Sequence, residues 1–190
     1  MREKTNQILE ASIKVFMDKG YKGASTKAIA EEASVAEVTI YRKFNNKHTL
    51  FEEAVRRQLM PSFTMESLDA RMDTKTFFTV LFEDRIDFMI KNRKLMKLVI
   101  RESLSENLPE NLQFVSIVHN ALKRIIENHI DHHGYHGDPA MITRTVVGIL
   151  ISYILFPPTP DFTAMDENER RNTISTHVNS VQDILASSRE

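Results

Sequence analysis

The sequence predicts an all-α fold of about nine helices. Apolar residues recur at the three- and four-residue spacing of amphipathic helices, and β-branched residues do not alternate with polar ones as they would in strands. Gly and Pro are scarce and gather mainly at residues 20–23, 61, 109, 134–139 and 157–160. We expect these positions to separate the helices.

The composition excludes several classes of protein. Apolar and charged fractions of 42% and 27% are typical of globular domains, which argues against a disordered or fibrous chain. The chain has no cysteine, so disulfide scaffolds, thiolate zinc sites and cysteine nucleophiles are excluded. The most apolar run, 146–156, is shorter than the roughly 20 residues that span a bilayer, and the charged start is unlike a signal peptide. We expect a cytoplasmic protein without a membrane partner.

Charge is divided unevenly along the chain. The net charge of -1 gives no indication of nucleic-acid binding. Residues 1–60, however, carry 11 Lys and Arg against 8 Asp and Glu, whereas residues 61–190 carry 14 against 18. This polarity has the sign expected if the N-terminal part approaches phosphates.

The first third of the sequence predicts four helices separated by tight breaks. The first covers about residues 4–19, with Gly20 suited to a left-handed C-terminal cap. The second begins after Ser25, a good N-cap, and the third covers about 36–44. Asn45 and Asn46 end the third helix before a fourth starts near Lys47. Two short helices joined by a turn of three or four residues form a helix-turn-helix.

Several residues of this segment suit phosphate contacts. The start of the second helix offers unpaired amide groups beside the hydroxyls of Ser25 and Thr26. Lys47 is a second anchor at the start of the fourth helix, and Tyr41 and Lys43 are candidates on the third. For Tyr41 a core role is an equally good interpretation.

The third helix also presents candidate base readers. Glu37 can accept from a cytosine amine, Val38 and the methyl group of Thr39 can touch thymine methyls, and Arg42 can read guanine with two hydrogen bonds. A solvated face is the alternative for Glu37 and Arg42. Because strong base readers are few, affinity is expected to come mostly from phosphates, and sequence choice partly from DNA shape.

Positions at fixed spacing carry a resemblance to a known family. The segment combines a Thr opening the second helix, an Ile-Ala pair, an aliphatic residue followed by Tyr, then Phe, and Lys-x-x-Leu. The matching residues are Thr26, Ile29, Ala30, Ala33, Val35, Ile40, Tyr41, Phe44, Lys47 and Leu50, with Ile8, Leu9, Ala11, Phe16 and Gly20 upstream. This pattern resembles the DNA-binding domain of the TetR family of transcriptional regulators. Ser34 stands where the family has its turn glycine, and Ala36 where it has a capping serine.

The remaining sequence predicts longer helices at about 74–91, 93–105, 109–132, 138–156 and 166–187. The 138–156 helix carries two apolar stripes, which favours burial of two faces, and a second subunit is the simplest second partner. We expect a four-helix dimer interface formed with the last helix; burial inside one domain is the alternative. The interface candidates are Ile142, Val146, Ile149, Tyr153, Ile174, Val178, Val181 and Leu185.

The resemblance implies a division of labour within the chain. Residues 1–50 would be the helix-turn-helix DNA-binding domain, and residues 51–190 a helical bundle that binds a small-molecule effector and dimerises. Large flexible, aromatic and polar side chains of the middle helices could line the pocket, although core filling explains most of them. The ligand-binding candidates are Phe78, Phe82, Arg85, Met89, Met96, Phe114, Val118 and His119.

Other constellations point to no chemistry. The histidines at 129, 132, 133 and 136 invite a metal hypothesis, but only Asp131 and Asp138 could complete a site, and solvated loop histidines are commoner. We expect no metal and no cofactor. No H-E-x-x-H, Walker-type, G-x-S-x-G or dinucleotide motif occurs, so an enzyme is not expected.

Together these observations predict a ligand-responsive transcriptional regulator that binds a palindromic operator as a homodimer, most simply as a repressor. The effector is not identified by the sequence. The alternative is a helical DNA-binding protein without an effector, from which ligand-dependent release of DNA would distinguish the first interpretation.

Overall fold

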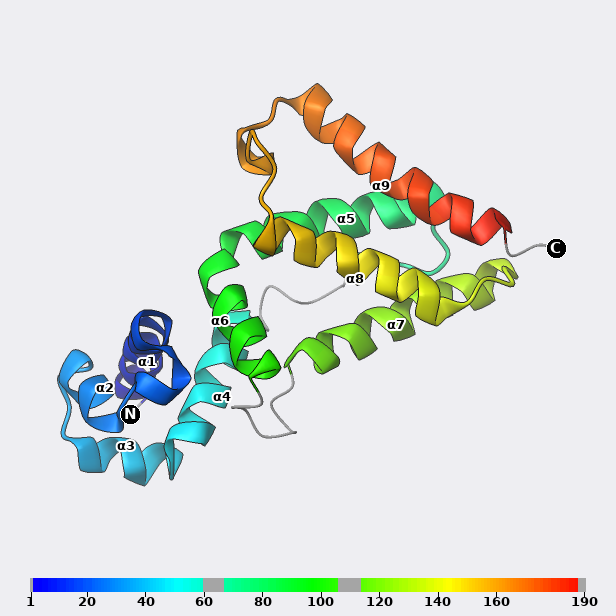
Figure 1. Ribbon diagram of the computed structural model, residues 1–190. Coiled ribbons are helices and arrows are strands. Elements are labelled where there is room, and N and C mark those ends of the chain that lie inside the picture. The colour runs from blue at the N-terminus through cyan, green and yellow to red at the C-terminus, as the bar shows by residue number, and fades with distance from the viewer. Residues whose placement is uncertain (1, 60–66, 106–113, 188–190) are drawn as a thin grey trace. The chain divides into compact units, whose positions relative to one another are not determined.

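The computed structural model describes residues 2–59, 67–105 and 114–187, and every regular element within them is helical (Figure 1). The all-α prediction is confirmed. The described chain falls into two compact units, one containing α1–α4 and nearly all of α6, the other α5, nearly all of α7, α8 and α9. The predicted functional division at residue 50 stays a prediction.

The first unit is built around α1 (Arg2–Gly23), which packs against α2 (Thr26–Glu32) and α4 (Lys47–Leu59). The short α3 (Glu37–Phe44) packs on α2 and α4, and α6 spans Arg93–Leu104. Phe16 of α1 and Phe51 of α4 meet edge to face in the core, with ring centroids 4.9 Å apart. This core fixes the position of the two helices that form the candidate site.

Gly20 interrupts α1 as the sequence predicts. Its backbone has a φ of 71°, the left-handed region that glycine adopts without steric penalty. A further helical turn follows before the chain reaches α2. The amide of Tyr21 donates to a carboxylate oxygen of the buried Glu102 on α6, at 3.3 Å.

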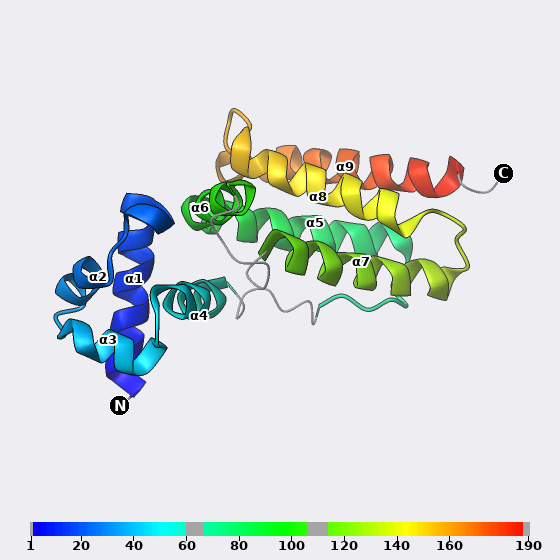
Figure 2. The same ribbon diagram turned by 60° about the horizontal axis from the view of Figure 1, so that its bottom comes forward.

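The second unit contains α5 (Thr74–Lys91), α7 (Phe114–His133), α8 (Pro139–Leu155) and α9 (Glu167–Ser187), which lie side by side in Figure 2. α5 packs against both α8 and α9. Asp73 and Asp138 cap α5 and α8 by accepting from the amides two or three residues ahead. A 3-10 helix at Phe162–Ala164 was not predicted, and residues 109–113 of the predicted 109–132 helix lie outside the described residues.

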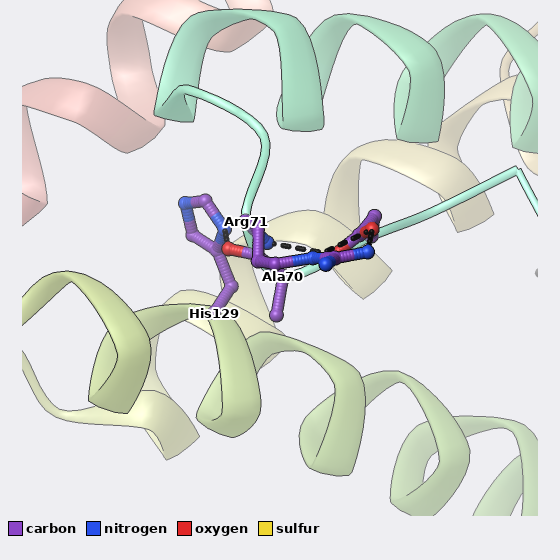
Figure 3. Close-up of polar contacts among 4 residues, drawn as sticks. Ala70, Arg71 and His129 are labelled. Carbon is purple, nitrogen blue, oxygen red and sulfur yellow. Dashed lines mark hydrogen bonds and ion pairs between the residues drawn. The ribbon is translucent and has the colours of Figure 1, made fainter.

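A buried histidine ties the segment before α5 to α7. The Nδ1 of His129 bonds the carbonyl of Ala70 at 3.1 Å, next to the Asp69–Arg71 ion pair (Figure 3). Its Nε2 lies 3.2 Å from the hydroxyl of Thr74. The ring stacks on Phe77 with centroids 4.0 Å apart. Burial lowers the pKa of His129 to about 4, so this histidine is a neutral structural anchor at pH 7.

The predicted dimer stripes need correction. Seven of the eight candidates are buried inside the single chain, at the packing of α8 and α9 with α5, and Ile149 is half-buried. A partner subunit cannot reach side chains that the chain's own helices already cover. The seven buried residues are Ile142, Val146, Tyr153, Ile174, Val178, Val181 and Leu185.

Across the described ranges, no helix is long and apolar enough to cross a membrane.

Candidate nucleic-acid interface

The turn between α2 and α3 has the hydrogen bonds of a tight helix-turn-helix. The amide of Val35 donates to the carbonyl of Ala30 at 2.9 Å, and the amide of Ser34 donates to that of Glu31 at 3.1 Å. Ser34 has a φ of 50°, which places a non-glycine residue in the left-handed region. Ser34 therefore adopts the strained turn conformation at the position where the TetR family has its glycine.

One face of the third helix packs against the core, and the opposite face is exposed to solvent. Ile40 and Phe44 are buried and anchor α3 to the core. Ala36 at the N-cap makes no side-chain hydrogen bond to the helix. The end of α3 is fixed by Asn45 with a φ of 64°, and Asn46 caps α4 by accepting from the amide of Thr49. Both asparagines thus terminate and restart helices where the sequence predicts.

The outer face of α3 presents a mixed apolar and basic surface. Val38 is 71% exposed and Tyr41 50% exposed, and Arg42 is also exposed. Thr39 is half-buried beside them. An exposed valine followed by an arginine one turn later matches what major-groove readout needs, a methyl contact and a forked donor.

Three of the predicted DNA contacts are hydrogen-bonded to one another. The hydroxyl of the buried Thr26 donates to Glu37 Oε1 at 2.6 Å and lies 3.0 Å from the Tyr41 hydroxyl. These three residues, the Thr26–Glu37–Tyr41 cluster, join the first turn of α2 to α3. Tyr41 therefore combines the two interpretations left open by the sequence: its hydroxyl is a structural link, and half of its surface remains exposed.

The remaining phosphate candidates also have partners within the chain. The Ser25 hydroxyl caps α2 by accepting from the amide of Ala28 at 3.1 Å, which leaves its own proton for an outside acceptor. Lys43 donates to Thr5 of α1 at 2.9 Å. Lys47 donates to the carbonyls of Tyr21 and Ala24. An ammonium group has three protons, so both lysines keep a proton and their charge.

The structure adds α1 to the interface, which the sequence did not predict. A hollow of about 660 Å³ lies between the start of α1, the turn and α3. Lys4 and Gln7 line it from α1, opposite Arg42 and Lys43. The signal in the sequence was the position of Lys4 on the same helix face as Gln7, but only the packed fold shows that this face borders α3.

Comparison with known proteins identifies this domain. The family model for bacterial regulatory proteins of the tetR family matches residues 8–54, which contain the whole helix-turn-helix. Residues 8–54 are thus similar to the N-terminal domain of the TetR family. The predicted resemblance is thereby confirmed, and the matched residues contain the helix-turn-helix of α2 and α3, the motif with which such regulators bind DNA.

Relatives support the TetR assignment over different lengths. The uncharacterized HTH-type transcriptional regulator YvkB of Bacillus subtilis is 46% identical over 52 residues, 27% of this chain and 28% of that protein. The HTH-type transcriptional repressor KstR of Mycolicibacterium smegmatis is 32% identical over 89 residues, 47% of this chain and 41% of that protein. The matched part thus spans less than half the length of these relatives.

The TetR-type fold extends beyond the matched sequence. The crystal structure of a bacterial regulatory protein of the tetR family from Rhodococcus RHA1 superimposes with a TM-score of 0.70 at 16% identity. The alignment covers 94% of this chain and 96% of that one. At such low identity the likeness shows the fold of the C-terminal helices and not their ligand.

The predicted ligand-binding residues are mostly core side chains. Five of them are buried on α5 and α6, Val118 of α7 is buried, and His119 is half-buried. The side chain of Phe114 lies outside the described residues. None of the other seven lines the hollow of about 620 Å³ that the second unit forms between α5, α9 and the 3-10 helix. The five buried residues are Phe78, Phe82, Arg85, Met89 and Met96.

The histidine cluster offers no metal site within the described ranges, where no group of three or more His, Asp or Glu side chains could hold an ion. His129 uses both ring nitrogens on protein atoms, and His133 bonds the carbonyl of Met72 at 2.8 Å. These contacts explain His129 and His133 as links between α7 and the segment 70–74.

Proposed function

We propose that this chain is a ligand-responsive transcriptional regulator, acting as a repressor, that binds a palindromic operator as a homodimer. The observation that carries the proposal is the surface of α3, where Val38 and Arg42 are exposed and Arg42 lines a hollow together with Lys4 and Lys43. A protein that works on DNA in this way acts in the bacterial cytoplasm. The relatives are regulators, which favours this function over catalysis.

In this proposal two recognition helices enter successive major grooves, about 34 Å apart or somewhat more. Phosphate contacts come from Ser25, Tyr41, Lys43 and Lys47, and base contacts from Val38, Thr39 and Arg42. Each phosphate contact releases counterions, so binding weakens steeply as salt concentration rises.

The test is a selection of bound duplexes from a random-sequence library, using the full-length protein. An enriched inverted repeat, bound with a steep salt dependence, supports the proposal. Absence of salt-sensitive binding to any duplex contradicts DNA binding, and enrichment of a single asymmetric site contradicts the palindromic dimer.

We place the proposed dimer interface on the exposed face of α8 instead of on the buried stripes. Met141, Gly148 and Leu155 follow one another at seven-residue spacing, and Thr145 and Ser152 fall between them, the pattern of a helix-pairing seam. Met141 and Leu155 are exposed, and a side chain added at Gly148 would meet no atom within 4 Å. Such an open apolar and small-residue stripe lets a second helix approach closely.

A charge placed on this seam provides the test. Gly148→Glu should give a monomer in analytical ultracentrifugation, because two carboxylates would face each other across the two-fold axis. Lys75→Glu, at an exposed position of α5, is the control and should stay dimeric. A dimeric Gly148→Glu protein would exclude this face.

The effector proposal concerns the second unit. The hollow there has an apolar floor that includes Val80, Phe162 and Ile174, and charged residues at its rim. These features favour an amphipathic small molecule. Ligand binding and DNA binding are thermodynamically linked. A true effector must therefore lower the protein's affinity for the operator by the same factor by which the operator lowers the protein's affinity for the effector. A panel of small amphipathic molecules screened by thermal shift, then by operator release, separates a ligand-responsive regulator from an effector-independent one.

A further inference from the structure

In the Thr26–Glu37–Tyr41 cluster, the donor and the acceptor of each hydrogen bond are fixed. Thr26 has a single hydroxyl proton, and it donates that proton to Glu37 Oε1 at 2.6 Å. The contact of 3.0 Å between Thr26 and Tyr41 therefore needs the Tyr41 hydroxyl as its donor. Both hydroxyl protons then point into the protein.

The direction of these hydrogen bonds matters for phosphate binding. A phosphate oxygen is only an acceptor, so it needs a proton from the side chain that binds it. Tyr41 is half exposed, but its proton is turned inward toward Thr26. In the DNA-free protein the Thr26 and Tyr41 protons are thus already used, and of the three hydroxyls that the sequence offers to phosphates only that of Ser25 keeps its proton.

Glu37 has a second effect on the same surface. It lies in the first turn of α3, where a negative charge stabilises the helix, and where Ala36 provides no side-chain cap. The same negative charge repels a phosphate that approaches Tyr41 within a Debye length. The Glu37 carboxylate therefore stabilises α3 and weakens DNA binding.

We propose that Glu37 is a built-in competitor of the DNA phosphate: it holds the Thr26 proton and thereby turns the Tyr41 proton inward, away from the DNA. This inference rests on the proposed DNA-binding function. Glu37 is then a positioning residue that lowers affinity on every sequence and reads no base. Binding rotates the Tyr41 hydroxyl outward, which breaks its bond to Thr26.

The test uses Glu37→Gln in the full-length dimer, titrated by fluorescence anisotropy against the selected operator and against duplexes with each base pair changed. A glutamine amide can donate to Thr26, which releases the Thr26 proton to the Tyr41 oxygen and the Tyr41 proton to the solvent side. The expected result is a Kd lowered roughly fivefold on every duplex, the value of about one hydrogen bond. The same variant should melt at a slightly lower temperature, because α3 loses a favourable charge.

Two matched variants complete the design. Glu53→Gln removes the same charge from an exposed position of α4, and its change in Kd measures the general effect of charge. In a Tyr41→Phe background, Glu37→Gln should change Kd no more than Glu53→Gln does, because no phenol proton remains to be released.

Each other outcome overturns the inference. A loss confined to duplexes altered at one C·G pair would make Glu37 a base reader. A change equal to that of Glu53→Gln would make it part of a solvated face, and a gain that persists in the Tyr41→Phe background would reduce it to a bare charge. If the wild-type protein binds no duplex at all, the proposed DNA-binding function itself fails. The other outcomes all require DNA binding by the wild-type protein, so they overturn only the inference about Glu37.

Discussion

The Nζ of Lys47 lies 2.9 Å from the carbonyl oxygen of Tyr21 and 4.6 Å from the centre of the same residue's ring. It also donates to the carbonyl of Ala24 at 3.0 Å. Lys47, the first residue of α4, thus links α4 to the C-terminal end of α1, just before α2 begins. A residue predicted as a phosphate anchor has a structural role as well.

Lys47→Ala should therefore lower both stability and DNA affinity. Two carbonyls lose a charged donor, which is expected to lower the free energy of unfolding by about 1–3 kcal/mol. Binding should weaken about equally on all duplexes, with a smaller salt slope. Urea unfolding and anisotropy titrations at several salt concentrations measure the two effects. Lys22→Ala, an exposed lysine near the same turn, is the control; if it matches Lys47→Ala in stability, the carbonyl contacts are unimportant.

Two substitutions in the turn should stabilise the protein. Ser34→Gly removes the strain of a φ of 50°, and Ala36→Ser supplies the side-chain acceptor that α3 lacks. Each should raise the free energy of unfolding by about 1 kcal/mol. The measurement is the urea midpoint at an unchanged denaturant slope. Ser25→Ala is the opposite control, because it removes an existing cap and should destabilise by a similar amount.

Arg42→Ala should change which bases are preferred. Arg42 is exposed on α3 and lines the hollow beside it, and its guanidinium can hold guanine with two hydrogen bonds. Loss of such a pair should remove about 1–3 kcal/mol of discrimination at one position of each half-site. Selection from a random library with wild type and variant compares the preferred sequences. An equal loss on every sequence would show that Arg42 contacts only phosphate.

His129 should make stability depend on pH below neutrality. Its pKa is lowered from 6.5 to about 4 in the folded chain, so the unfolded chain binds more protons between these values. Stability is therefore complete above pH 6.5 and falls as pH decreases toward 4, by about 3 kcal/mol from this group.

The corresponding variant is His129→Gln, with denaturant unfolding measured from pH 7 to pH 4. It should be less stable at pH 7, since the contacts with Ala70, Thr74 and Phe77 are disturbed. Its stability should also vary less with pH than that of the wild type. His136→Gln, at an exposed loop position, should keep the wild-type dependence. A variant curve parallel to the wild-type curve would exclude His129 as the titrating group.

Local signals in the sequence determined the helices and their ends. The predicted span 74–91 is that of α5, and the caps at Ser25 and Gly20 and the breaks at Asn45 and Asn46 lie where they were expected. Helix periodicity, capping and left-handed residues depend on neighbours within about one turn, so a single sequence contains this information.

Only the tertiary structure decided which side chains meet. Thr26 and Glu37 are 11 residues apart, and nothing in the spacing shows that a hydroxyl offered to DNA is bonded to a carboxylate predicted to read a base. The two apolar stripes of α8 have the same period, so periodicity could not show that Ile142 and Val146 would be covered by the chain's own helices. Periodicity tells which residues share a face; the packing of helices distant in sequence decides what that face touches.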